Sequence, residues 1–185
     1  MDNTWGGNPE YQGKYLGMSQ TGTTYSYGTQ TVSTGFDHIK ELGVNAVQIL
    51  PFFDASNKEE REDQSNWGYN PQNYNVLEGQ YSTDPYNAET RIKEFKQMVQ
   101  AYHDANIEIV MDVVYNHTYK GDVFPSFYYG ADLSGCGNGI NAKKGDMVSK
   151  MIRDSLEYWI TEYNIDGFRF DLVGVFDVDV YSSWG

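Results

Sequence analysis

The chain has 185 residues, of which 13 are basic and 26 are acidic, and its net charge is −13. This length can bury the core of one domain, but a complete (β/α)₈ barrel needs about 250 residues. The acidic excess argues against a nucleic-acid partner or an anionic membrane surface, and neither a membrane-spanning run nor a signal peptide is visible. The single cysteine, Cys136, leaves the redox compartment open. The cytoplasm is favoured as the location, and secretion stays open.

The first half of the chain predicts one helix and one strand between irregular segments. Residues 1–31 are rich in Gly, Thr, Tyr and Asn without a helical or strand period, which predicts a loop. A helix should begin near Ser33 or Thr34 and end at Gly43, and residues 46–50 should form a strand. Pro51 then opens a loop of more than thirty residues, whose aromatic content favours a functional role.

The second half alternates helices and strands. The next helix carries apolar residues on one face: Ile92, Phe95, Val99 and Tyr102. It leads into a strand at 107–114 and a second long loop at 115–145. The last helix has apolar residues at spacings of three and four, namely Val148, Ile152, Leu156 and Trp159. The strand 165–171 follows this helix. This order predicts an α/β fold with parallel strands joined by right-handed crossovers.

Arg169 and Asp171 lie two residues apart in the last predicted strand. Strand side chains alternate between faces, so both should project to the same side. A guanidinium this close favours the ionised carboxylate, which suits a nucleophile at neutral pH and not a proton donor. A structural ion pair that closes a strand explains the two residues equally well, because paired charges also occur at structural sites.

The strand 107–114 holds Asp112 in a nearly continuous apolar run and is followed by Asn116 and His117. Such runs are typical of parallel strands covered on both faces. Polar groups at the carboxyl ends of strands mark the functional rim of an α/β barrel. A lone histidine is more often structural than catalytic. The strands 107–114 and 165–171 both end in polar side chains, and this shared feature favours a functional site at their carboxyl ends.

Residues 112–117 and 167–171 resemble the first and second signature regions of the alpha-amylase family of glycoside hydrolases, family 13. Residues 65–71 resemble the Tyr-Asn-Trp-Gly-Tyr-Asp-Pro signature of type I pullulanases, with departures at Ser65 and Asn70. The resemblance implies a partial (β/α)₈ TIM barrel that holds about strands 2 to 4 with their helices and long βα loops. The whole chain, 1–185, is then expected to be a fragment of the catalytic barrel, with residues 33–179 as its core segment.

The resemblance also implies roles for the site residues. Asp171 matches the nucleophile, and Arg169 matches the cation that keeps it ionised, a role expected to need the planar guanidinium fork. His117 matches a hydrogen-bond partner of the sugar at the cleaved bond, and Tyr69 matches the aromatic platform under it. Two further residues of the pullulanase-like motif are expected to contact substrate: Trp67 and Asn70.

Asp112 and Asn116 are expected to be structural residues at the site. The asparagine at the Asn116 position is a calcium ligand in many alpha-amylases, but one oxygen is far short of the six to eight that calcium takes. We therefore expect no cofactor and no metal, with calcium as the minority alternative.

The implied activity belongs to the parent protein. It should be a retaining α-glucan hydrolase, most simply a pullulanase that cuts α-1,6 branch links in pullulan, starch or glycogen. The family's third and fourth signature regions, which carry the acid/base glutamate, are not found in the sequence, so the chain alone is expected to be inactive. Its expected partners are an α-glucan polysaccharide or oligosaccharide and the remainder of the barrel. Two alternatives stay open: a non-catalytic glucan-binding fragment, and a truncated product without its own function.

Overall fold

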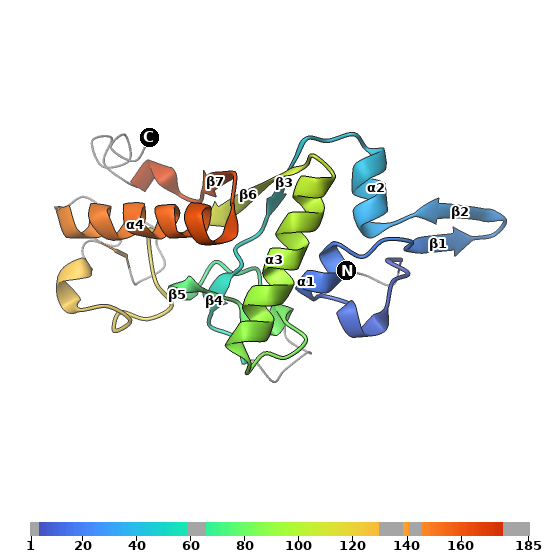
Figure 1. Ribbon diagram of the computed structural model, residues 1–185. Helices are drawn as coiled ribbons and strands as arrows, with labels where there is room; N and C mark the ends of the chain where they lie inside the picture. Colours follow the sequence, from blue (N-terminus) through green and yellow to red (C-terminus); the bar gives the residue numbers. More distant parts are fainter. Residues whose placement is uncertain (1–3, 59–65, 130–138, 141–145, 176–185) are drawn as a thin grey trace. The chain divides into compact units, whose positions relative to one another are not determined.

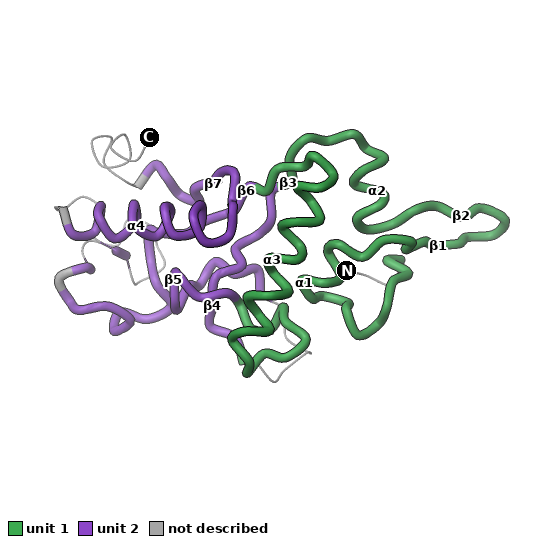
Figure 2. The backbone as a smooth tube through the Cα atoms, viewed as in Figure 1, with its two compact units in different colours: residues 1–47, 58–63, 78–109 green, residues 48–57, 64–77, 110–185 purple. Residues whose placement is uncertain are grey.

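The computed structural model describes residues 4–58, 66–129, 139–140 and 146–175 (Figure 1). The chain divides into two compact units (Figure 2). The first unit contains residues 1–47, 58–63 and 78–109, and the second contains residues 48–57, 64–77 and 110–185. Every site residue expected from the sequence belongs to the second unit.

The first unit begins with short elements inside the segment expected to be a loop. They are η1 (Pro9–Tyr11), α1 (Tyr15–Met18), β1 (Thr24–Tyr27) and β2 (Gln30–Ser33). Strands β1 and β2 pair antiparallel around a two-residue turn, in which Gly28 has a φ of +62°. The prediction of a loop over 1–31 is therefore wrong here. The strands are short and carry mostly exposed polar residues, so they lack the apolar alternation that identifies a half-buried strand.

Two longer helices of the first unit follow the predicted pattern. Helix α2 spans Gly35–Glu41, with Thr34 as its N-cap residue, and Gly43 adopts a φ of +68° beyond its end. Helix α3 spans Ala88–Asp104 and begins at Asn87, whose side chain accepts hydrogen bonds from two backbone N–H groups of the first turn. Its Tyr102 hydroxyl donates to the Met18 carbonyl at 3.0 Å, which ties α3 to α1.

The buried face of α3 differs from the predicted one at a single position. Phe95, Val99 and Tyr102 are buried as expected, whereas Ile92 is exposed. Glu94 is buried instead, because its carboxylate accepts a hydrogen bond from the Thr83 backbone N–H at 2.9 Å.

The predicted strands form a three-stranded sheet with the order β3-β6-β7. These strands are β3 (Ala46–Ile49), β6 (Glu108–Val113) and β7 (Gly167–Phe170). β6 and β7 run parallel, with Asp112 opposite Arg169. The central strand is fully buried at Met111 and Val113, as its continuous apolar run predicts. The described strands therefore make an open sheet and do not close into a barrel.

The long loop after Pro51 contains a second small sheet. β4 (Phe53–Ala55) pairs antiparallel with β5 (Pro71–Leu77), and η2 (Gly79–Tyr81) follows. The register shifts twice along β4, and buried residues occur at every third position of β5, namely Pro71, Tyr74 and Leu77. The expectation of a loop is therefore wrong here. β4 is buried at all three positions and β5 at every third one, so neither strand shows the period of two that identifies a half-buried strand.

Helix α4 (Asp146–Tyr163) confirms the predicted helix before the last strand. Its four predicted core residues are all buried: Val148, Ile152, Leu156 and Trp159. The Trp159 indole N–H donates to the Tyr74 carbonyl at 3.0 Å, which joins α4 to β5. Two short 3-10 helices complete the described elements, η3 (Ser126–Tyr128) and η4 (Val173–Val175). Two positions named from the sequence, Ser65 and Cys136, lie outside the described residues, as does the end of the expected core segment at residue 179.

Candidate active site

The ends of β6 and β7 bring Asp112, Arg169 and Asp171 together. Arg169 Nη1 donates to both carboxylate oxygens of Asp112, at 2.9 and 3.0 Å, and to Oδ1 of Asp171 at 3.0 Å. Asp171 lies one residue beyond β7, and its backbone N–H continues the ladder by donating to the Val113 carbonyl at 2.9 Å. The prediction that Arg169 and Asp171 project together is confirmed.

The guanidinium of Arg169 does not bind as the expected two-nitrogen fork. In the described part of the chain, all of its hydrogen bonds run through Nη1, which faces three carboxylate oxygens. The parallel strand register causes this, because it places Asp112 directly opposite Arg169 and so puts two carboxylates beside one nitrogen. The hydrogen bond with Asp112 raises the pKa of Arg169, so the guanidinium stays charged.

Asp112 is the residue on which the contacts of the site converge. Its side chain is 1 % exposed, and its Oδ2 accepts hydrogen bonds from the Tyr69 hydroxyl at 2.6 Å and from Gln48 Nε2 at 3.1 Å. These donors come from the loop before β5 and from β3. Gln48 was not expected at the site. The sequence carried one signal for it, since it is the polar residue of an otherwise apolar strand.

Tyr69 and His117 are joined to each other and to this cluster. Burial raises the pKa of Tyr69 to about 12, and its hydrogen bond to Asp112 adds to the rise, so the phenol remains a donor at neutral pH. His117 Nε2 donates to the Tyr69 carbonyl at 2.8 Å, and Nδ1 lies 3.0 Å from Oδ1 of Asn116. Both ring nitrogens thus have partners in the chain, and the role of His117 as a sugar ligand stays a prediction.

The other two residues of the pullulanase-like motif differ in exposure. Trp67 is 70 % exposed. The Asn70 side chain has a buried Oδ1 with no hydrogen-bond partner among the described residues. Gly68 between them has a φ of +85°, and a Cβ atom there would lie 2.6 Å from the Pro51 carbonyl oxygen, so this turn requires glycine. The substrate contacts expected of Trp67 and Asn70 stay predictions.

Comparisons with known proteins identify the family of the chain. The family model for the alpha-amylase catalytic domain matches residues 20–132. The chain belongs to the alpha-amylase family. It is 38 % identical to the pullulanase of Bacillus subtilis (strain 168) over 183 residues, which cover 91 % of this chain and 25 % of that protein. It is 40 % identical to the chloroplastic isoamylase 3 of Oryza sativa subsp. japonica over 165 residues, covering 75 % of this chain and 21 % of that protein.

Solved pullulanases of the family show the same fold. The pullulanase of Paenibacillus barengoltzii, in complex with maltohexaose and alpha-cyclodextrin, superimposes with a TM-score of 0.89 and 41 % identity over 99 % of this chain and 30 % of that chain. The type I pullulanase of B. subtilis with maltose gives 0.89 and 36 %, over 99 % of this chain and 27 % of that chain. The predicted fold, part of a (β/α)₈ barrel, is confirmed. The chain spans about a quarter of the length of these proteins.

Calcium at Asn116, the minority alternative, stays a prediction. Among the described residues, no group of three or more His, Cys, Asp or Glu side chains is placed to hold a metal ion. Asn116 is buried, its Oδ1 faces His117, and its Nδ2 has no hydrogen-bond partner in the described part of the chain.

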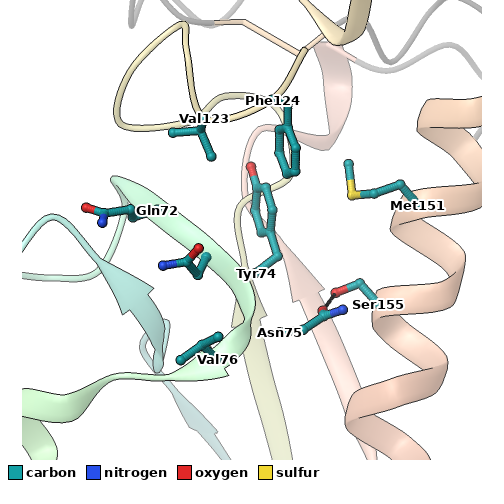
Figure 3. A pocket seen from close by; sticks show the side chains of 9 residues that line it. Gln72, Tyr74, Asn75, Val76, Val123, Phe124, Met151 and Ser155 are labelled. Carbon is teal, nitrogen blue, oxygen red and sulfur yellow. Dashed lines mark hydrogen bonds between the residues drawn. The ribbon is translucent and has the colours of Figure 1, made fainter. Parts of the chain in front are cut away.

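The second unit also has a cavity of about 250 Å³ at one edge of β5 (Figure 3). The rings of Tyr74 and Phe124 stack beside it with an interplanar angle of 3°, and Ser155 of α4 donates to Asn75 at 2.5 Å. None of the residues expected at the site lines this cavity. Among the described helices, none has both the length and the apolar character needed to cross a membrane.

Proposed function

We propose that this chain carries the nucleophile side of a retaining α-glucan hydrolase that cuts α-1,6 branch links in pullulan, starch or glycogen. The observation that supports this proposal is the position of Asp171, at the end of a parallel strand and 3.0 Å from Arg169 Nη1. Its relatives include pullulanases and an isoamylase, which are glucan-debranching enzymes. Solved pullulanases that share its fold were crystallised with maltohexaose and maltose.

The proposed reaction begins with attack by an Asp171 oxygen on the anomeric carbon of the bound glucose unit. A covalent glycosyl ester forms and the glycosidic C–O bond breaks, while a second carboxyl group protonates the leaving oxygen. The same second group then removes a proton from the water that hydrolyses the ester. Arg169 holds the Asp171 carboxylate in position during the first step through the 3.0 Å contact of its Nη1 with Oδ1.

Asp112 does not fit the role of the proton donor. Its carboxylate is buried, and both of its oxygens accept hydrogen bonds, from Arg169, Tyr69 and Gln48. The two carboxyl groups of a retaining enzyme lie about 5 to 5.5 Å apart, on either side of the scissile bond. We therefore propose that the acid comes from a part of the barrel other than the described residues, and that this chain alone does not hydrolyse pullulan.

Glucan binding is proposed to use Tyr69, which contacts Asp112, and Trp67 of the same motif. The apolar C–H faces of a pyranose pack on aromatic rings, and its edge hydroxyl groups take hydrogen bonds. Trp67 is exposed, whereas Trp5 and Trp159 are buried, so sugar added to the chain should change the fluorescence of Trp67. Its exposure also favours the second candidate function, a fragment that binds glucan without cleaving it.

The proposal is tested by titrating the chain with an α-1,6-branched maltosaccharide and following tryptophan fluorescence. A saturable change at millimolar sugar is expected, and it should disappear in Trp67→Phe and be absent with a β-linked cello-oligosaccharide. No change with either sugar would contradict glucan binding. Pullulan is then added as a substrate. Turnover that Asp171→Asn abolishes would show that the chain itself supplies an acid, and this part of the proposal would be wrong.

A further inference from the structure

Gln48 contacts Asp112 of the candidate site, but it lies outside the family-like motifs at 65–71, 112–117 and 167–171. It lies on β3, and its Nε2 donates to Oδ2 of Asp112 at 3.1 Å. We infer that Gln48 is a positioning residue, which acts through Asp112 and Arg169 to hold the carboxylate of Asp171 in place. The inference rests on the proposed role of Asp171 as the nucleophile.

The carboxylate of Asp112 is buried and receives hydrogen bonds from three residues. A buried carboxylate needs donors in place of the water that it has lost. Oδ1 of Asp112 accepts from Arg169, and Oδ2 accepts from Tyr69, from Gln48 and from Arg169. Two neutral donors thus carry part of the charge of Asp112, and Arg169 does not have to compensate all of it.

Arg169 Nη1 carries two protons but faces three carboxylate oxygens. The oxygens of Asp112 and Asp171 lie 2.9 to 3.0 Å from this nitrogen, so the two carboxylates compete for it. Each donor that Asp112 receives from elsewhere leaves more of Nη1 for Asp171. Loss of the Gln48 donor should therefore draw Nη1 toward Asp112 and weaken its hydrogen bond to Asp171.

Gln48 is the donor whose removal tests this competition most cleanly. Tyr69 is also proposed to contact the sugar and makes a backbone contact with His117, so its substitution would change several things together. Gln48 is exposed, and Gln48→Met keeps the length of the side chain while it removes the amide donor. The substitution leaves no cavity in the core, and the fold should be retained.

The test is the ¹³C resonance of the Asp171 carboxyl carbon in the full chain at pH 7, assigned by its loss in Asp171→Asn. In Gln48→Met we expect this resonance to move toward the position that it takes in Arg169→Met. A resonance that stays at its wild-type position would overturn the inference. The matched control is Gln100→Met on α3, which removes an amide donor from Asp104 and should leave the Asp171 resonance unchanged.

Gln48→Glu adds a pH-dependent version of the same test. A carboxyl group at this position donates to Asp112 only while it is protonated, and two neighbouring carboxyl groups tend to retain one proton between them. At pH 5 the Asp171 resonance should lie near that of the wild type at the same pH, and at pH 8 it should lie near that of Gln48→Met. Equal offsets from the wild type at both pH values would contradict a role as donor.

This readout is independent of sugar chemistry. If the chain fails to bind glucan while the Asp171 resonance moves in Gln48→Met, the proposed function fails and the positioning contact stands. If glucan binds and the resonance does not move, the inference fails and the proposed function stands.

Discussion

Asp112 and Asp171 are both aspartates beside Arg169, and their surroundings give them different roles. The Asp112 side chain is 1 % exposed and has three donor residues, whereas the Asp171 side chain is 23 % exposed and bonds to Arg169. An acceptor that is saturated by donors has no oxygen available for attack. Asp112 and Asp171 share Arg169 as a partner. Their different burial and hydrogen bonding make Asp112 an orienting group and leave Asp171 as the proposed nucleophile.

Removal of Arg169 should destabilise the fold, because it leaves the buried charge of Asp112 with neutral donors only. We expect Arg169→Met to lower the free energy of unfolding by about 1 to 3 kcal/mol, measured by urea denaturation at neutral pH. Combination with Asp112→Asn should recover part of this loss, since the unpaired charge is then absent. Arg153→Met, at an exposed position of α4, should change stability by less than about 0.5 kcal/mol. Equal losses for the two arginines would contradict the assigned contact.

Tyr69 gives the site a pH dependence in the alkaline range. Its pKa is raised to about 12 in the folded chain, whereas a tyrosine in an unfolded chain titrates near about 10. The folded state favours the neutral phenol, so this contribution to stability is fully present below about pH 10 and is lost as the pH rises toward about 12.

Tyr69→Phe should therefore flatten the decline of stability between about pH 10 and 12, as measured by urea unfolding over a series of pH values. Tyr27→Phe is the control, because Tyr27 is exposed on the β1–β2 hairpin. A wild-type slope in Tyr69→Phe would show that the raised pKa is not linked to folding.

At the level of helices and strands, the elements with a long apolar pattern were predictable. The apolar stripe of α4 and the continuous apolar run of β6 identified both elements, because burial sets these patterns directly. The β1–β2 hairpin and the β4–β5 pair were missed. The first is short and polar, and the second has irregular register, so neither shows the alternation of a regular strand.

The site was predictable to a similar extent. The motifs placed Asp171, Arg169 and Asp112 at the ends of neighbouring strands, and the structure brings them together. The use of a single Arg169 nitrogen and the contact from Gln48 depend on the register and order of strands that are distant in sequence. Local pattern does not fix such long-range pairing.

Helix α4 contributes buried residues to the core of the second unit, and two of its isoleucines test this assignment. Ile152 is 0 % exposed and Ile160 is 49 % exposed. Ile152→Ala should lower the free energy of unfolding by about 2 to 5 kcal/mol, because it removes buried methyl groups and leaves a cavity. Ile160→Ala should cost less than about 0.5 kcal/mol by the same urea measurement. Comparable losses at both positions would mean that α4 does not present the described face to the core.

For the molecule as a whole, the described sheet is open. β3 and β7 each have one neighbour among the described strands, and an unpaired strand edge offers backbone groups for pairing. We propose that the remainder of the barrel is the partner of these edges and the source of the proton donor. The chain spans 25 % of the B. subtilis pullulanase and 30 % of the P. barengoltzii structure.

The role of Asp171 as the nucleophile can be tested without the proton donor. In α-maltotriosyl fluoride the leaving group departs as fluoride and needs no protonation. An Asp171 oxygen would bond to the anomeric carbon as the C–F bond breaks. The resulting ester should accumulate, because its hydrolysis requires the base that the described residues do not supply.

The measurement is the intact mass of the chain after incubation with this fluoride, followed by peptide mapping. We predict a mass increase of one maltotriosyl group located on Asp171, absent in Asp171→Asn and retained in Asp154→Asn, an aspartate paired with Lys150 on α4. A folded wild-type chain that remains unlabelled, or that carries the label on another residue, would contradict the account.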